Sequence, residues 1–359
     1  MRVSNVPYIG TTVKFFFDYL RYPLALGGVE LFFVLSGFLI GNILIRTFVN
    51  SDTFSFTEVR NFWVRRWFRT LPLFWLILSM EIILYKLMDL RSHEMPKSLF
   101  YVFLQNIWYP HPQYFFGEAW SLSVEEWFYL TLPVAMCLAA VIFKPKNKQA
   151  FLLKVFAGYV LTFVAIRFIN AFHPINGPDQ DSGIRKVVLF RLDAVMYGVL
   201  MAYFNYYYPA ALHKLKNYLL AVGLAGIVVL SWLVISDKIH IMNAANPSLR
   251  FASDAFLYLL LPLFFSFWLP YANSVTQLRN KYALGFFTHI SKISYSMYLV
   301  HFSLIFIPFF IYMEQVPPHT AALLYLLYWA IVIGLSTTLY KYFEYPVMRL
   351  RERFSKKER

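Results

Sequence analysis

Long apolar runs alternate with short polar segments along the whole chain. Each run is about 20 residues long, which is the length that an α-helix needs to cross the hydrocarbon core of a bilayer. The pattern therefore predicts an all-α, polytopic membrane helix bundle. We expect nine membrane helices, at residues 26–46, 70–88, 123–143, 151–171, 186–206, 216–236, 251–271, 290–312 and 320–342. The longest interval, residues 89–122, is partly apolar and is expected to lie along the membrane surface or dip into it.

The composition supports a lipid environment. The chain is 59% hydrophobic and 14% charged, whereas soluble domains carry roughly a quarter of charged residues. The net charge of +14 would suit nucleic acid, but the basic residues lie between the apolar runs and in the tail, as membrane anchors do. We therefore expect contact with membrane lipids and no nucleic-acid partner. Because Cys137 is the only cysteine, the chain cannot form an internal disulfide.

The basic residues also orient the predicted bundle. If nine helices alternate across the membrane, the arginine- and lysine-rich segments share one side, at residues 47–69, 144–150, 207–215, 272–289 and 347–359. The positive-inside rule makes that side cytoplasmic. This predicts a single membrane domain over residues 1–359, with its core at 26–346 and a basic cytoplasmic tail at 347–359. The N-terminus would then be outside, which would be simpler to achieve with one more helix upstream.

Four charged side chains lie inside apolar runs, near the predicted outer face: Glu30, Glu125, Arg191 and Asp193. Because a charge that faces lipid costs a few kcal/mol, these groups should face the protein interior. They can line a polar pocket that opens outward, or they can form structural salt bridges. A buried carboxylate such as Glu125 can also act as a general base or position a sugar hydroxyl.

The segment around Glu125 has a simpler interpretation as a helix start. Ser121 has the residue type and position of an N-cap, and Glu125 and Glu126 would follow in the first turn, where the helix dipole favours acids. This interpretation accounts for Glu126 on its own. It leaves the role of Glu125 open.

Three arginines lie at the cytoplasmic entrance of the second run. In a helix, Arg65 and Arg69 share one face at i, i+4 spacing, with Arg66 beside them. Guanidinium groups bind phosphates through paired hydrogen bonds, so these residues could hold a nucleotide-bearing donor. The alternative is that they anchor the helix at lipid headgroups, as basic residues beside any span do.

A single histidine lies near the middle of the eighth run. His301 has Tyr298 one turn away on the same side, and it can be either a hydrogen-bonding strut or a catalytic group. Glu344, at the inner end of the last run, could pair with the cytoplasmic arginines, and we interpret it as structural. The sequence has no metal-ligand spacing, phosphate-binding loop, dinucleotide fingerprint or nucleophile elbow. We therefore expect no metal and no bound cofactor.

Six segments, in order, resemble the acyltransferase-3 family of integral-membrane enzymes that O-acylate cell-envelope glycans. They are Phe-Phe-Val-Leu-Ser-Gly at 32–37, Arg-Arg-x-x-Arg-x-x-Pro at 65–72, Trp-Ser-Leu-x-x-Glu-x-x-Phe-Tyr at 120–129, Arg-x-Asp at 191–193, Ser-Tyr-x-x-Tyr-Leu-x-His at 294–301 and Glu-x-Pro at 344–346.

The resemblance implies a ten-helix core in the bacterial inner membrane. It implies transfer of an acyl group, as a rule acetyl, from cytoplasmic acyl-CoA, here acetyl-CoA, to a hydroxyl of an envelope saccharide or lipid-linked glycan outside. The roles that it implies are catalysis by Glu30, Glu125 and His301, donor binding by Arg65, Arg66 and Arg69, and acceptor binding by Trp120, Ser121, Arg191, Asp193 and Tyr298.

The chain departs from the family at its N-terminus. The family's first helix carries a basic residue followed by a histidine that is central to catalysis, whereas the first histidine here is His93. Residues 1–25 are expected to be the loop after that helix. We expect that Met1 is a mis-assigned start or that the chain is a fragment. The alternatives are a transporter of glycan or acyl donor, and an inactive truncated member of the family.

Overall fold

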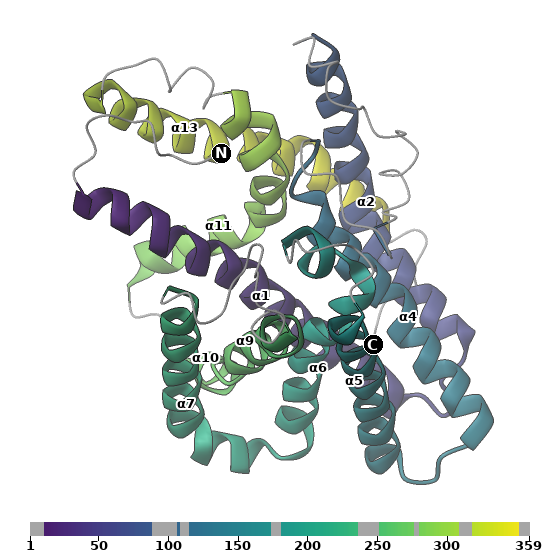
Figure 1. The fold of residues 1–359 in the computed structure, drawn as a ribbon. Helices are drawn as coiled ribbons and strands as arrows, with labels where there is room; N and C mark the ends of the chain where they lie inside the picture. Colours follow the sequence, from purple (N-terminus) through teal and green to yellow (C-terminus); the bar gives the residue numbers. More distant parts are fainter. Residues whose placement is uncertain are drawn as a thin grey trace. The chain divides into compact units, whose positions relative to one another are not determined.

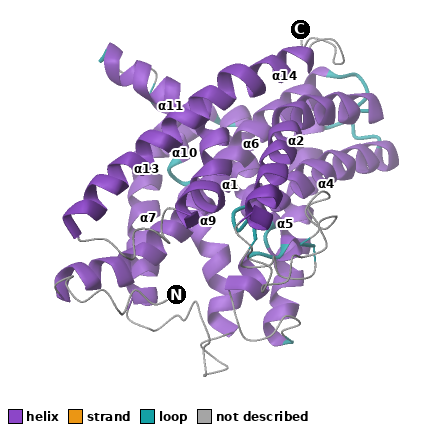
Figure 2. Ribbon diagram, turned by 90° about the horizontal axis from the view of Figure 1, so that it is seen from above, coloured by secondary structure: helices purple, strands orange, loops and turns teal. Residues whose placement is uncertain are grey.

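The computed structural model describes residues 11–87, 106–107, 115–173, 181–235, 251–275, 280–308 and 318–351. Figure 2 shows helices joined by loops, with no strand in these ranges. The predicted all-α architecture is therefore confirmed. Within the same ranges, seven helices are long and apolar enough to cross a membrane by length and composition.

The chain divides into two compact units. Unit 1 comprises Met1–Ser55, Asn106–Pro110 and Val124–Thr276, and unit 2 comprises Phe56–Gln105, His111–Ser123 and Gln277–Arg359. The expectation of a single membrane domain stays a prediction. Each unit is described by itself below.

Unit 1 is built around the pair α1 and α6 (Figure 1). Its helices are α1 (Thr11–Asn50), most of α4 (Ala119–Phe143), α5 (Lys148–Phe172), α6 (Leu192–Tyr207), α7 (Pro209–Ile235), α9 (Tyr258–Ser266) and α10 (Leu269–Ser274). Three short elements precede α6 and α9, namely the π-helix η1 (Asp181–Arg185), the 3-10 helix η2 (Val188–Phe190) and the π-helix η3 (Ser253–Leu257).

Two glycines allow the backbones of α1 and α6 to approach closely. A Cβ atom added at Gly37 would lie 1.9 Å from the carbonyl oxygen of Val195, and one added at Gly198 would lie 2.0 Å from the carbonyl oxygen of Val34. Small residues at such crossings are typical of membrane helix pairs, because packing and not hydrophobic burial holds helices together in lipid. The glycine of the Ser36-Gly37 pair is therefore explained by packing.

Unit 2 joins two segments between residues 56 and 123 to the C-terminal residues 277–359. Its helices are α2 (Phe56–Leu87), the start of α4, α11 (Lys281–Val300), α13 (Pro318–Leu339) and α14 (Tyr345–Leu350), with the π-helices η4 (His301–Phe306) and η5 (Tyr340–Glu344). Its core packs α2 and the turn before α4 against α11, η4 and α13 through buried side chains, among them Leu73, Phe74, Ile77, Phe116, Leu299, Val300 and Val332.

The described helices overlap all nine predicted runs, but several bounds differ. Helices α2, α7 and α11 begin at Phe56, Pro209 and Lys281, so parts of the polar segments 47–69, 207–215 and 272–289 are helical. The run 251–271 is divided among η3, α9 and α10. Helix α1 begins at Thr11, so the expectation of a loop at residues 1–25 is wrong for residues 11–25. The physical reason is that no glycine or proline interrupts residues 11–22. The run 186–206 is divided between η2 and α6. Most of the interval 89–122 and residues 352–359 of the tail lie outside the described residues.

Candidate functional site

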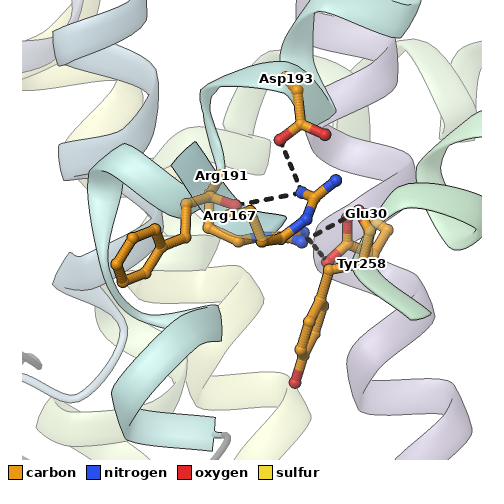
Figure 3. A network of polar contacts seen from close by, with 6 residues as sticks. Glu30, Arg167, Arg191, Asp193 and Tyr258 are labelled. Carbon is orange, nitrogen blue, oxygen red and sulfur yellow. Dashed lines mark hydrogen bonds and ion pairs between the residues drawn. The ribbon is translucent and has the colours of Figure 1, made fainter. Parts of the chain in front are cut away.

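A closed network of ion pairs occupies the interior of unit 1 (Figure 3). A guanidinium nitrogen of Arg191 donates a short hydrogen bond to the carboxylate of Glu30, which connects α6 to α1. Nη1 of Arg167, on α5, donates to Oδ1 of Asp193 at 2.8 Å. All four side chains are fully buried, and two positive charges balance two negative ones. Such pairing is how a membrane protein tolerates charges inside its spans.

Local backbone geometry directs Arg191 and Asp193 to different partners. Arg191 lies at the break between η2 and α6, and Asp193 lies in the first turn of α6. Nη1 of Arg191 also donates to the carbonyl oxygen of Tyr258 at 3.3 Å, and its guanidinium group lies 4.6 Å from the centre of the Tyr258 ring. Nη1 of Arg167 donates to the carbonyl oxygen of Phe190 at 3.2 Å.

This geometry favours the salt-bridge interpretation over an open pocket for Glu30, Arg191 and Asp193. Several of their polar atoms, including Oε2 of Glu30 and Oδ2 of Asp193, have no hydrogen-bond partner among the described residues, so the network can accept further polar groups. Catalysis by Glu30 and acceptor binding by Arg191 and Asp193 stay predictions. Sequence reasoning missed Arg167, although an arginine inside the run 151–171 is itself a signal of a buried partner.

The segment at the start of α4 contributes to both units. Glu125 and Glu126 are buried in unit 1, where the hydroxyl of Tyr129 lies 2.6 Å from Oγ of Ser36 on α1. The N-cap role expected for Ser121 is wrong, because α4 already begins at Ala119. Ser121 instead lies inside the first turn, and its hydroxyl contacts residues of unit 2.

In unit 2, His301 follows the last residue of α11, Val300, and is the first residue of the π-helix η4. Its Nδ1 atom lies 2.7 Å from the carbonyl oxygen of Tyr298. A carbonyl oxygen only accepts hydrogen bonds, so Nδ1 carries the ring proton, and Nε2 of the neutral ring has a lone pair that can accept a proton. The hydroxyl of Tyr328, on α13, donates to the carbonyl oxygen of His301 at 3.2 Å. This places Tyr298 and His301 in contact, as the sequence predicted.

Glu118 lies beside this histidine and was missed by sequence reasoning. Its buried carboxylate accepts hydrogen bonds from the backbone N–H of Ser303, at 3.2 Å, and from the hydroxyl of Ser303. Its carbonyl oxygen accepts from the hydroxyl of Tyr298 at 3.0 Å, and Ser121 shares a short hydrogen bond with the same tyrosine. Ser121 and Tyr298, two of the residues predicted to bind the acyl acceptor, therefore meet at Glu118. Trp120, a third, is buried in the first turn of α4.

A second carboxyl group lies near Glu118. Glu81, on α2, is 5% exposed and its carboxyl interacts electrostatically with that of Glu118, while its Oε1 atom has no hydrogen-bond partner among the described residues. Burial raises the pKa of Glu118 to about 7, although the hydrogen bonds from Ser303 act in the opposite direction. An acid inside the run 70–88 was the sequence signal for Glu81.

The three arginines lie inside α2, nine to thirteen residues after its start at Phe56, and so not at the helix entrance that the sequence predicted. Arg65 and Arg66 are half-buried, and Arg69 is exposed. The positive charge of Arg69 acts on Glu344 at the end of η5, which fits the interpretation of Glu344 as a structural partner. Glu344 is buried and accepts a hydrogen bond of 2.8 Å from Ser296. In the described part of the chain, no group of three histidine, cysteine or acidic side chains could hold a metal ion.

Comparison with known proteins identifies the family. Residues 3–341 match the sequence model of the acyltransferase-3 family, which is described as an acyltransferase domain. The chain therefore belongs to this family, and its long apolar helices make it an integral membrane protein.

Its relatives include O-acetyltransferases of Staphylococcus aureus. A candidate O-acetyltransferase of strain COL is 27% identical over 297 residues, which are 77% of this chain and 46% of that protein. The O-acetyltransferase OatA of strain NCTC 8325 is 26% identical over 345 residues, which are 90% of this chain and 52% of OatA. The chain thus spans about half the length of these relatives. No solved structure matches it.

Proposed function

We propose that the protein is a membrane O-acyltransferase that moves an acetyl group from acetyl-CoA to a hydroxyl group of a cell-envelope saccharide or glycolipid. In this reaction the C–S bond of the thioester breaks, an ester C–O bond forms, and the proton of the hydroxyl passes to the sulfur of CoA. Family membership and the names of the relatives support the reaction class.

One observation carries the proposal for this chain: Nδ1 of His301 lies 2.7 Å from the carbonyl oxygen of Tyr298, which can only accept, so Nδ1 holds the proton when the ring is neutral. Nε2 is then the ring atom that can take a proton from a hydroxyl group, as general base catalysis requires. The hydroxyl groups of Ser121 and Tyr298 lie in the same cluster and could hold neighbouring hydroxyls of a saccharide. Glu125 and Glu30, in unit 1, stay proposed catalytic groups on the strength of the family motifs.

We assign donor binding to Arg65, Arg66 and Arg69. Guanidinium groups suit the phosphates of CoA, and these three lie within about one turn of each other on α2. Glu81 follows Arg66 by 15 residues in the same helix α2, which places them about 22 Å apart along its axis at 1.5 Å per residue. Helix α2 therefore extends over most of a hydrocarbon core of about 30 Å. The donor side would be cytoplasmic, with the C-terminus on that side of the bacterial inner membrane.

The test uses membrane vesicles that contain the full chain, acetyl-CoA labelled in the acetyl group, and a lipid-linked glycan fraction from the same membranes. We expect base-labile label in the saccharide, and we expect His301→Gln to abolish it. His289→Gln is the matched control, because His289 is an exposed histidine of the same helix α11. Movement of unlabelled glycan across the vesicle membrane without acetylation would replace the enzyme proposal with a transporter.

A further inference from the structure

We propose that Glu118 is a positioning residue for His301: it holds the π-helical turn that carries the histidine and thereby fixes the direction of Nε2. The catalytic importance of that direction rests on the proposed function. The positioning itself follows from contacts within unit 2 and can be tested without any assay of acyl transfer.

His301 lies at a change in backbone geometry. The α-helix α11 ends at Val300, and the wider π-turn begins at His301. Single π-turns interrupt the regular hydrogen-bond ladder and frequently occur at functional sites. Here, groups from outside the helix bind the turn: Glu118 accepts from the N–H and the hydroxyl of Ser303, and Tyr328 donates to the carbonyl oxygen of His301.

Glu118 contacts residues both before and after His301 in the sequence. Its carboxylate binds Ser303, two residues after His301, and its carbonyl oxygen binds the hydroxyl of Tyr298, three residues before it. Tyr298 in turn accepts the Nδ1 proton of His301 through its own carbonyl oxygen. One residue therefore fixes the two points between which the imidazole ring is held.

The turn that carries Glu118 is itself constrained. Phe116 is buried and has a φ of 46°, in the left-handed region that a bulky residue rarely adopts. This conformation brings the N–H of Gly117 to 3.0 Å from Oγ of Ser303, so that Ser303 is bound by two consecutive residues. Strained backbone persists only where surrounding contacts compensate for it, and it is concentrated at functional sites.

The charge state of Glu118 should control the strength of this hold. Only an ionised carboxylate accepts with both oxygens, so protonation removes one acceptor from Ser303. The titratable groups that interact with Glu118 are Glu81 from α2, Tyr298 from α11 and Tyr328 from α13, and His301 at the start of η4 contacts Tyr298. Its raised pKa, about 7, places this change within the physiological range.

The experiment measures the reaction of His301 with diethyl pyrocarbonate, by peptide mass spectrometry, in the full chain in lipid nanodiscs. His289 on the same helix is the internal reference. We expect Glu118→Ala to raise the ratio of His301 to His289 modification at least about threefold, because the ring is no longer held. Glu118→Gln keeps one oxygen acceptor for the Ser303 N–H, as the protonated carboxyl does, so at every pH it should show the ratio that wild type reaches below about pH 7.

Glu344→Ala is the matched control. It removes the same charge from another buried glutamate of unit 2 that is bonded to a serine of α11, and it should leave the His301 ratio unchanged. An equal effect of Glu118→Ala and Glu344→Ala on that ratio, or no effect of either, would overturn the proposal. If Glu118→Ala does not fold, Ser303→Ala replaces it, because that variant removes one of the two bonds to Glu118 and should shift the ratio in the same direction.

Acetyl transfer supplies the second readout. Glu118→Ala should lower kcat about tenfold or more while the KM for acetyl-CoA changes less than about threefold, since a misplaced catalytic group costs rate and not donor binding. Glu118→Gln keeps one acceptor oxygen, as the protonated carboxyl does, so it should lose less rate than Glu118→Ala and should match the rate that wild type reaches when Glu118 is protonated. If wild type transfers no acetyl group, the proposed function fails, while the histidine modification still decides whether Glu118 positions His301.

Discussion

The crossing of α1 and α6 predicts a large effect for the substitution Gly198→Ala. The added Cβ would lie 2.0 Å from the carbonyl oxygen of Val34 and 2.6 Å from the backbone nitrogen of Phe38. Both atoms belong to a helix backbone, so no side-chain rotation can relieve the contact. The helices would have to separate by about 1.4 Å, the difference between 2.0 Å and the 3.4 Å at which ordinary contact begins.

Such overpacking costs about 1–3 kcal/mol or more, while replacing glycine by alanine in a helix recovers about 1 kcal/mol. We place the cost at the upper end because the backbone of both helices must move. The net loss of unfolding free energy is then about 2 kcal/mol, which corresponds to a decrease in Tm of roughly 4–8 °C for a unit of this size. The separation would also strain the pair of Glu30 and Arg191, each of which lies seven residues from its glycine, Gly37 or Gly198.

Cys137 provides the assay. It is the only cysteine, it is buried, and it belongs to unit 1, so a thiol-reactive fluorophore reports the unfolding of that unit during a thermal ramp. Gly158→Ala is the control, because nothing lies within 4 Å of its added Cβ. A Tm for Gly198→Ala equal to or above that of Gly158→Ala would refute the packing argument.

Further predictions concern charge. Arg167→Met should destabilise the protein by about 3–5 kcal/mol, because it leaves Asp193 buried without a partner, and adding Asp193→Leu should recover most of that loss in the same thermal assay. Arg69→Ala should raise the KM for acetyl-CoA more than it lowers kcat, and Glu125→Ala should do the reverse; equal losses of protein abundance, with unchanged kinetics, would show that both residues are structural. The folded-state pKa of Glu118, about 7, exceeds its ordinary value of 4.5, so protonation stabilises the fold and Tm should rise as the pH falls from about 7 toward 4.5. Over the same pH range the rate of acetyl transfer should fall. Glu118→Gln should remove the contribution of Glu118 from the pH dependence of Tm and from that of the rate. A parallel loss of Tm and activity in acid would contradict this prediction.

Much of the helical architecture was predictable because a run of about 20 apolar residues leaves few alternatives to a membrane helix. Charges inside such runs also identified Glu30, Arg191 and Asp193 as interior groups. Their pairing was not predictable, since Glu30 and Arg191 are 161 residues apart and pattern alone does not say which helices are neighbours.

The cluster around His301 shows a different limit. Tyr298 was found because it lies one helical turn away, and helical spacing is local information. Glu118 is 185 residues from its partner Ser303, and the π-turn that brings them together has no periodicity of its own. The helix start at Ala119, which overturned the N-cap interpretation of Ser121, likewise depends on a turn with an unusual backbone at Phe116.

The buried pair of Glu30 and Arg191 has a consequence for biosynthesis. Its two members are separated by 161 residues, and ribosomes add about 5–20 residues per second, so the carboxylate of α1 is made roughly 8–32 s before its arginine. During that interval α1 holds an acid that lipid disfavours. We therefore expect α1 to remain beside the insertion machinery until the arginine emerges, and nascent chains arrested before residue 191 to crosslink to that machinery through α1.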